Sequence, residues 1–218
     1  LSIPPSSFDQ PGFCAAVEKC KEHIRAGDIF QVVLSQRFKT PSAGVDPFDV
    51  YRALRVINPS PYMYFLRFAQ LRIAGASPEV MVRVEHGHAE VRPIAGTRPR
   101  GATPEADAEQ ARILQESVKD RAENLMIVDL MRNDLSKVCA PGSVRAPTLF
   151  GVESFANVHH LVSEVVGRLQ GDHTAFDLFA ASFLPGSITG APKLKAMEII
   201  SGLEQRGRGA YCGSLAWS

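Results

Sequence analysis

Three carboxylates recur along one predicted helical segment. Glu116, Asp120 and Glu123 are spaced i, i+4 and i+7, so a helix would place them on one face. Carboxylates crowded on one face repel one another unless they are solvated or bound to a cation. Mg2+ favours a few carboxylates together with retained water. The spacing is therefore typical either of a solvated acidic face or of a magnesium site.

A glycine-bearing loop leads into a predicted helix at residues 186–193, with the sequence Gly-Ser-Ile-Thr-Gly-Ala-Pro-Lys. Free backbone amides at a helix N-terminus favour anions. Ordinary capping by Ser187 or Thr189 is the alternative. The loop is thus a candidate anion site.

Glu79 and His160 have chemistry that depends on their burial. Glu79 follows Ser77 and Pro78 at a predicted strand end. A partly buried glutamate with a raised pKa can act as a general acid, but a glutamate after proline is usually on the surface. His160 lies in a strand-like run, where a lone histidine is usually a satisfied core residue. The residues alone leave both roles open.

Composition excludes several classes of function. The chain has 218 residues, 45% of them hydrophobic, with 24 Lys and Arg against 23 Asp and Glu. This balance gives no sign of a nucleic-acid or anionic-membrane partner. No apolar run is long enough to cross a bilayer, and no signal-peptide pattern is visible. Cys14, Cys20, Cys139 and Cys212 lack metal-ligand spacing and predict free thiols, so we expect a cytoplasmic protein.

Predicted hairpins come first along the chain, and predicted helices interrupt the strands later. Helices are expected at 7–26, 47–56, 104–138, 174–182 and 192–204, the third as one helix or two abutting ones. Strands are expected at 29–38, 62–68, 71–76, 80–85, 88–94, 158–170 and 211–217. This order predicts an α+β class with mostly antiparallel sheet. The chain ends, Leu1 and Ser218, suggest a single domain over 1–218 that is incomplete at both ends.

Seven ordered segments together resemble the chorismate-binding synthases, which include component I of anthranilate synthase and of aminodeoxychorismate synthase. The segments are residues 27–37, 77–79, 92–101, 119–134, 158–163, 186–193 and 211–214. The resemblance implies two facing antiparallel β-sheets with helices packed outside and an active site between them. Measured against the family pattern, an N-terminal region is missing. Also missing is a C-terminal part that carries a chorismate-binding arginine, a glycine-rich carboxylate loop and further magnesium carboxylates.

The resemblance also implies roles for the residues that could do chemistry. Glu123 matches a direct Mg2+ ligand, and Asp120 lies near the metal, which would hold the ring carboxylate of chorismate. Glu79 matches the general acid/base that protonates the departing ring hydroxyl while ammonia adds at C2. His160 matches a catalytic histidine tied to pyruvate elimination in anthranilate synthases.

Substrate and effector contacts follow from the same resemblance. The residues that match substrate contacts are Ala95, Gly96, Thr97, Ser187, Lys193 and Tyr211. Pro61, Tyr62 and Met63 resemble a segment that contacts inhibitory tryptophan in anthranilate synthases. The expected partner is a glutamine amidotransferase subunit that supplies ammonia.

Position 95 distinguishes two mechanisms within the family. Some aminodeoxychorismate synthases use a lysine there as a covalent nucleophile, whereas Ala95 has none, so ammonia itself would attack C2. Residues 59–63 and 93–97 favour anthranilate synthase. Residues 119–134, 150–155, 187–193 and 211–214 favour aminodeoxychorismate synthase.

We therefore predict an aminodeoxychorismate synthase of p-aminobenzoate and folate biosynthesis that works through a non-covalent intermediate aminated at C2. Anthranilate synthase, which releases anthranilate and pyruvate in tryptophan biosynthesis, is the first alternative. A truncated, non-catalytic domain that binds a partner is the second.

Overall fold

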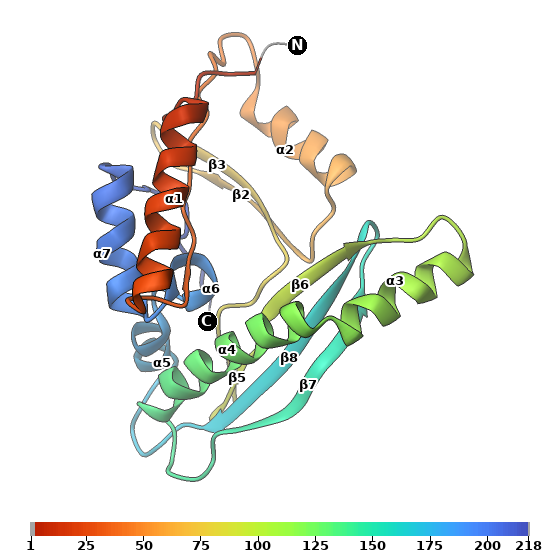
Figure 1. Ribbon diagram of the computed structural model, residues 1–218, viewed down its shortest axis with the longest axis vertical. Coiled ribbons are helices and arrows are strands. Elements are labelled where there is room, and N and C mark those ends of the chain that lie inside the picture. Colours follow the sequence, from red (N-terminus) through yellow and green to blue (C-terminus); the bar gives the residue numbers. More distant parts are fainter. Residues whose placement is uncertain (1–2, 218) are drawn as a thin grey trace. The chain divides into compact units, whose positions relative to one another are not determined.

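The computed structural model describes residues 3–217, which form two compact units (Figure 1). Unit 2 comprises Ser42–Ala181, and unit 1 combines the described residues up to Pro41 with those from Ser182 onward. Within residues 3–217, none of the helices combines the length and apolar character that a bilayer crossing requires. The four cysteines are free, as predicted.

The main sheet of unit 2 is built around one long strand, β8 (Val158–Arg168). Strands β5 (His88–Val91) and β6 (Ile94–Pro99) pair in succession along one edge of β8, and β7 (Arg145–Ser154) pairs along the other. Strand β4 (Arg83–Glu85) extends the sheet beyond β5, and all these pairings are antiparallel. The many valines of β8 suit a strand with neighbours on both edges and buried residues on both faces.

Bulges interrupt the ladders on both edges of β8. Strand β6 gains one residue between the pairs Ile94–Val162 and Thr97–His160, and Gly96 within this bulge has a φ of 103°. Strand β7 shifts register twice between Arg145 and Gly151. Because a bulge re-aims the side chains that follow it, Thr97 rather than Gly96 lies opposite His160.

Helices α3 (Pro104–Glu116) and α4 (Val118–Ser136) pack on this sheet (Figure 1). Thr103 and Ser117 cap their N-termini, each accepting a hydrogen bond from a backbone amide three residues later. The chain therefore has two abutting helices, one of the two forms expected. The core between them and the sheet includes Val91, Ala95, Val128, Leu135 and Val165.

A separate hairpin of unit 2 consists of β2 (Tyr62–Arg67) and β3 (Arg72–Ser77). Helix α2 (Pro47–Ile57) packs on it through an aromatic cluster of Phe48, Tyr51 and Phe65. Helix α5 (Ala175–Ser182) follows β8 and contributes Leu178 to the main core.

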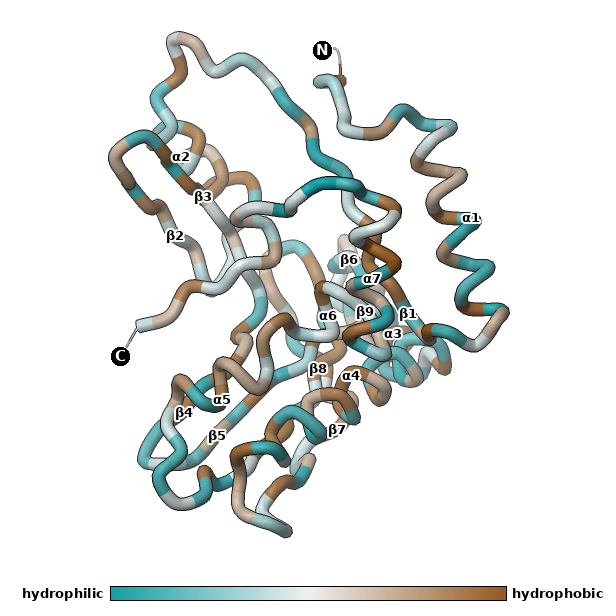
Figure 2. The backbone as a smooth tube through the Cα atoms, turned by 90° about the vertical axis from the view of Figure 1, so that its left-hand side faces the viewer, coloured by the Kyte–Doolittle hydropathy of each residue, from teal (hydrophilic) through white to brown (hydrophobic). Residues whose placement is uncertain are grey.

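Unit 1 contains two longer helices, a short helix and a two-stranded sheet. They are α1 (Gln10–Ala26), β1 (Gln31–Val32), α6 (Gly186–Thr189), β9 (Gly190–Ala191) and α7 (Lys193–Glu204). Hydrophilic and hydrophobic residues alternate along α1 (Figure 2), as expected of an amphipathic helix. Cys20, Ile29 and Ile199 form a small core with partly buried neighbours.

The α+β class with antiparallel sheets is confirmed, but several strand predictions are wrong. The strand expected at 29–38 is only Gln31–Val32 long, because its partner β9 offers just two residues. Residues 211–217 form turns and irregular backbone, with Cys212 at a φ of 66°, instead of a strand.

Two strands of the structure, β6 and β7, were not predicted. Proline and glycine within β7, at Pro147 and Gly151, obscured its pattern, and the structure places both residues at register shifts.

Candidate functional site

Thr97 and His160 form a direct pair across the ladder between β6 and β8. The Thr97 hydroxyl lies 2.9 Å from His160 Nδ1, and the imidazole packs against the Phe155 ring at 5.4 Å between centres. Burial lowers the pKa of His160, while a hydrogen bond with the Gly96 backbone and the charge of Glu153 act in the opposite direction. His160 is therefore held as a neutral imidazole that can accept a proton.

Gly96 lies directly against helix α4. A methyl group at this position would be 3.0 Å from Asp120 Cβ and 3.2 Å from both Leu114 Cδ1 and Leu161 Cβ. The bulge of β6 and the first turn of α4 are thus in close contact. The predicted substrate residue Gly96 and the predicted metal residue Asp120 are brought together.

Ala95, in contrast, is buried among hydrophobic side chains. It is 6% exposed and belongs to the core cluster with Val128 and Met131. Any contact of this residue with a substrate would therefore come from its backbone.

The two predicted magnesium ligands, Asp120 and Glu123, are both half-buried on α4. The third carboxylate, Glu116, ends the preceding helix, is exposed, and pairs with Arg112 at 2.5 Å. Within residues 3–217 no group of three or more potential metal ligands is assembled. Because Mg2+ commonly takes one or two carboxylates and keeps several waters, Asp120 and Glu123 fit it as a partial ligand set.

Asn124, which the sequence did not single out, fixes the rotation of α4. Its side chain is fully buried, donates to the Leu161 carbonyl at 3.2 Å and accepts from Ser163 Oγ at 2.5 Å. Leu161 follows His160, and Asn124 follows Glu123. This pair of bonds therefore ties the helix that carries the carboxylates to the strand that carries the histidine.

A second polar network joins α3 to the β7–β8 hairpin. His159 is 1% exposed, and its ring nitrogens lie 2.8 Å from Ser154 Oγ and 2.9 Å from Asp107 Oδ1. Arg100 binds both oxygens of Asp107, at 2.7 and 2.6 Å. His159 and Arg100 therefore have a structural role in joining α3 to the hairpin.

Hydrogen bonds hold the Asp107 carboxyl in its ionised form. Its pKa is held well below the usual range, first by the Arg100 guanidinium and then by the amide of Gly101, with a smaller contribution from His159. The network therefore places a fixed negative charge beside the buried His159.

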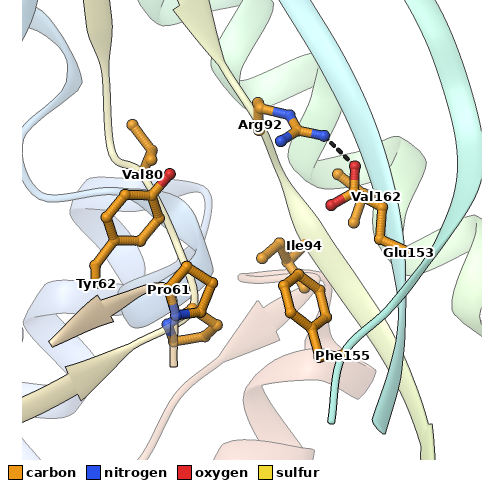
Figure 3. Close-up of a pocket in the computed structure, with 9 residues that line it drawn as sticks. Pro61, Tyr62, Val80, Arg92, Ile94, Glu153, Phe155 and Val162 are labelled. Carbon is orange, nitrogen blue, oxygen red and sulfur yellow. Dashed lines mark hydrogen bonds and ion pairs between the residues drawn. The ribbon is translucent and has the colours of Figure 1, made fainter. Parts of the chain in front are cut away.

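A cavity of about 190 Å3 lies within unit 2 (Figure 3). Pro61 and Tyr62, from the predicted tryptophan-contact segment, form part of its wall. Arg92 and Glu153 are hydrogen-bonded to each other at its edge, and Arg92 Nε also lies 3.8 Å from Glu90. The other lining residues are Pro78, Val80, Ile94, Phe155 and Val162.

The remaining cavity-related predictions fall on neighbouring residues. Met63 follows in β2 and is not among the lining residues given above. Glu79 is half-buried between two lining residues, Pro78 and Val80, and its backbone amide donates to Ser77 Oγ at 3.3 Å. The cavity thus has apolar walls, one ion pair and the predicted general acid next to its lining.

Three predicted substrate contacts belong to unit 1. Ser187 is half-buried in α6, and Lys193 begins α7 and donates to the Ser182 carbonyl at 3.3 Å. Tyr211 is 55% exposed, with the Arg208 guanidinium 5.5 Å from the centre of its ring. Neither α6 nor α7 has a side-chain N-cap hydrogen bond, so capping by Ser187 or Thr189 is not the role of this segment.

Comparison with known proteins places these features in a family. The sequence of residues 3–218 matches the family model of the chorismate-binding enzymes. Anthranilate synthase component 1 of Aquifex aeolicus is 49% identical over 97% of this chain, and that of Saccharolobus solfataricus is 45% identical over 100%. The chain spans 43% and 51% of the length of these two relatives.

Solved structures show the same likeness. Anthranilate synthase component I from Streptococcus pneumoniae matches 97% of this chain and 47% of its own, at a TM-score of 0.86 and 41% identity. The menaquinone-specific isochorismate synthase of Escherichia coli shares the fold at a TM-score of 0.81 and 20% identity. The chain belongs to the family of chorismate-binding enzymes.

Proposed function

We propose that this protein is the component of an anthranilate synthase that acts on chorismate, forming anthranilate and pyruvate with ammonia. The observation that carries the proposal is the identity of 44–50% to anthranilate synthase component 1 of several organisms over nearly the whole chain. The comparisons therefore favour the first alternative over the predicted aminodeoxychorismate synthase. The latter remains a second candidate because residues 119–134 and 187–193 resemble it.

The proposed first step uses Glu79. Ammonia forms a C–N bond at C2 of chorismate, the two conjugated ring double bonds shift, and the C–O bond between C4 and its hydroxyl breaks. Glu79 gives the proton with which the hydroxyl leaves as water. Asp120 and Glu123 would hold a magnesium ion, which supplies positive charge to the ring carboxylate when bound.

The proposed second step uses His160. Its neutral imidazole accepts the proton from C2 as the bond between the ring and the enolpyruvyl oxygen breaks. The ring becomes aromatic, and the side chain leaves as the enolate of pyruvate, which gains a proton at its methylene carbon to give pyruvate. The Thr97 hydroxyl, 2.9 Å from Nδ1, and the Phe155 ring orient the imidazole for this transfer.

Two further parts of the proposal concern partners and regulation. A glutamine amidotransferase subunit would supply the ammonia. Pro61, Tyr62 and Met63 would contact inhibitory tryptophan. The apolar cavity could accept its indole ring, and the Arg92–Glu153 pair could bind its carboxylate and ammonium groups.

The test is a product assay on the full-length protein with chorismate, magnesium and an ammonium salt. Fluorescent anthranilate, formed with equimolar pyruvate, is the expected result. His160→Asn should reduce anthranilate formation at least a hundredfold, while the exposed His173→Asn should leave it unchanged. A product trace dominated by aminodeoxychorismate would establish the second candidate. If chorismate is not consumed at all, both candidates are refuted.

A further inference from the structure

One largely buried arginine joins separate segments of unit 1. Arg208, just after α7, has a side chain that is 14% exposed. Its guanidinium donates to both carboxylate oxygens of Glu204, at 3.0 and 2.7 Å. It also donates to the carbonyls of Val33 at 2.7 Å and Ile188 at 3.1 Å. A planar guanidinium with five N–H donors can serve several partners at once.

Glu204 anchors the other side of this pair. Its side chain is 1% exposed, and Oε1 also accepts from the backbone amide and the hydroxyl of Ser35, each at 2.8 Å. Burial raises the pKa of Glu204, but the bonds from Arg208 and Ser35 outweigh burial and leave the pKa below its ordinary value. Both partners are therefore ionised and fully engaged at neutral pH.

The backbone that Arg208 holds is the glycine-bearing segment of α6 and β9. Beside the Arg208 bond to Ile188, the amide of Val33 donates to the Thr189 carbonyl at 3.0 Å, and that of Phe30 to the Ala191 carbonyl at 2.7 Å. At Gly190 a side-chain carbon would lie 2.2 Å from the Gln31 carbonyl oxygen. The segment is thus held both by its pairing with β1 and by the bond from Arg208.

Arg208 also reaches the turn that carries Tyr211. Its guanidinium carbon lies 5.5 Å from the centre of the Tyr211 ring, a cation–π distance. The same guanidinium contacts Cys212 Sγ at 3.4 Å, and this sulfur lies 3.9 Å from the Ile188 carbonyl. Arg208 therefore contacts both the turn and the α6 segment.

We propose that Arg208, oriented by Glu204, is a positioning residue that holds the Ser187 segment and the Tyr211 ring in one fixed arrangement for an anionic substrate. The proposal rests on the proposed function, because Ser187 and Tyr211 are the residues expected to contact chorismate. Arg208 itself does not touch the substrate. It acts by removing conformational freedom from the groups that do.

Arg208→Lys is the sharpest test because it keeps the charge. An ammonium can pair with Glu204, but it cannot also reach the carbonyls of Val33 and Ile188 in the planar arrangement of a guanidinium. Arg206→Lys is the matched control. Arg206 lies two residues earlier, half-buried, with its guanidinium 6.0 Å from the centre of the Phe8 ring.

Two measurements on the full-length protein separate positioning from simple stabilisation. The first is KM for chorismate with ammonium as nitrogen source, at a temperature where circular dichroism shows every variant folded. We expect Arg208→Lys to raise KM at least tenfold with kcat within threefold, and Arg206→Lys to change neither. The second is hydrogen exchange without substrate, where the Phe30 and Val33 amides should exchange at least tenfold faster in Arg208→Lys while β8 amides do not change.

Each outcome bears on one claim. Unchanged exchange at Phe30 and Val33 in the folded Arg208→Lys protein overturns the positioning role, whatever the activity. Faster exchange with an unchanged KM overturns its importance for the substrate. A wild-type protein that leaves chorismate unconsumed refutes the proposed function instead, and the exchange result then still decides whether Arg208 fixes the segment.

Discussion

Replacing Gly96 by alanine tests how closely the β6 bulge and helix α4 must approach. Gly96 has a φ of 103°, which disfavours any side chain and costs roughly 1–2 kcal/mol. The added methyl group would also lie 3.0–3.2 Å from Asp120, Leu114 and Leu161. Overpacking of this kind costs about 1–3 kcal/mol. We expect Gly96→Ala to lower the free energy of unfolding by about 2–5 kcal/mol.

Gly87→Ala is the control that isolates crowding from backbone strain. Gly87 has a φ of 78° in the turn between β4 and β5, and nothing lies within 4 Å of an added methyl group. It should lose only the strain of roughly 1–2 kcal/mol. Urea unfolding followed by circular dichroism should therefore separate the two variants by about 1–3 kcal/mol.

The same substitution should affect activity. Because the methyl group presses on the Asp120 side chain, we expect Gly96→Ala to reduce kcat/KM for chorismate about tenfold or more and to raise the magnesium concentration that gives half activity. Gly87→Ala should keep both values. If the two variants unfold within about 0.5 kcal/mol of each other, the contact between Gly96 and α4 does not constrain the site and the reasoning fails.

Three further predictions concern single groups. Glu123→Ala should abolish magnesium-dependent turnover, whereas Asp129→Ala, at an exposed position of the same helix, should not; equal activity of both removes Glu123 from the metal site. Burial lowers the pKa of His160, so kcat/KM should stay level as pH falls to about 6.5, the ordinary pKa of histidine, and decline only below that value. A decline centred above about 6.5 contradicts the assignment. Asp107 has a depressed pKa, mainly because of Arg100, so its contribution to stability is complete above its unfolded pKa of about 3.9 and is lost as pH falls further. Asp107→Asn should therefore be less stable at pH 7 and lose less stability between pH 5 and pH 2 than wild type, as measured by urea midpoints; parallel pH curves would exclude this network.

Elements with local signals were predictable from the sequence. Helix α2 begins at Pro47 after the capping Asp46. Helix α1 ends at Ala26 and is capped by Gly27, which has a φ of 80°. The hairpin of β4 and β5 turns at His86 and Gly87, between the strands expected at 80–85 and 88–94. In these cases the residues that determine the structure lie within a few positions of it.

Contacts between distant residues were not predictable. Strand β7 contains Pro147 and Gly151 and is a strand only because β8 supplies an edge that tolerates two register shifts. The bonds from Arg208 to Val33 and from Ser35 to Glu204 join residues far apart in the chain, and no local pattern records them. The candidate site was found by resemblance, since residues 97 and 160 have no spacing that would connect them.

Ala95, next to the bulge in β6, affects both the packing of the sheet and the chemistry expected of the site. One extra residue in this strand sets Thr97 opposite His160, while Ala95 packs in the core with Val128. Val128 lies on α4, the helix that carries Asp120 and Glu123. A small side chain at 95 is therefore part of what lets α4 approach the sheet, besides lacking the nucleophile that a covalent mechanism needs. Both consequences agree with the proposed reaction: a strand packed tightly on α4 brings Gly96 close to Asp120, and a site without a lysine at position 95 would use ammonia as the attacking group.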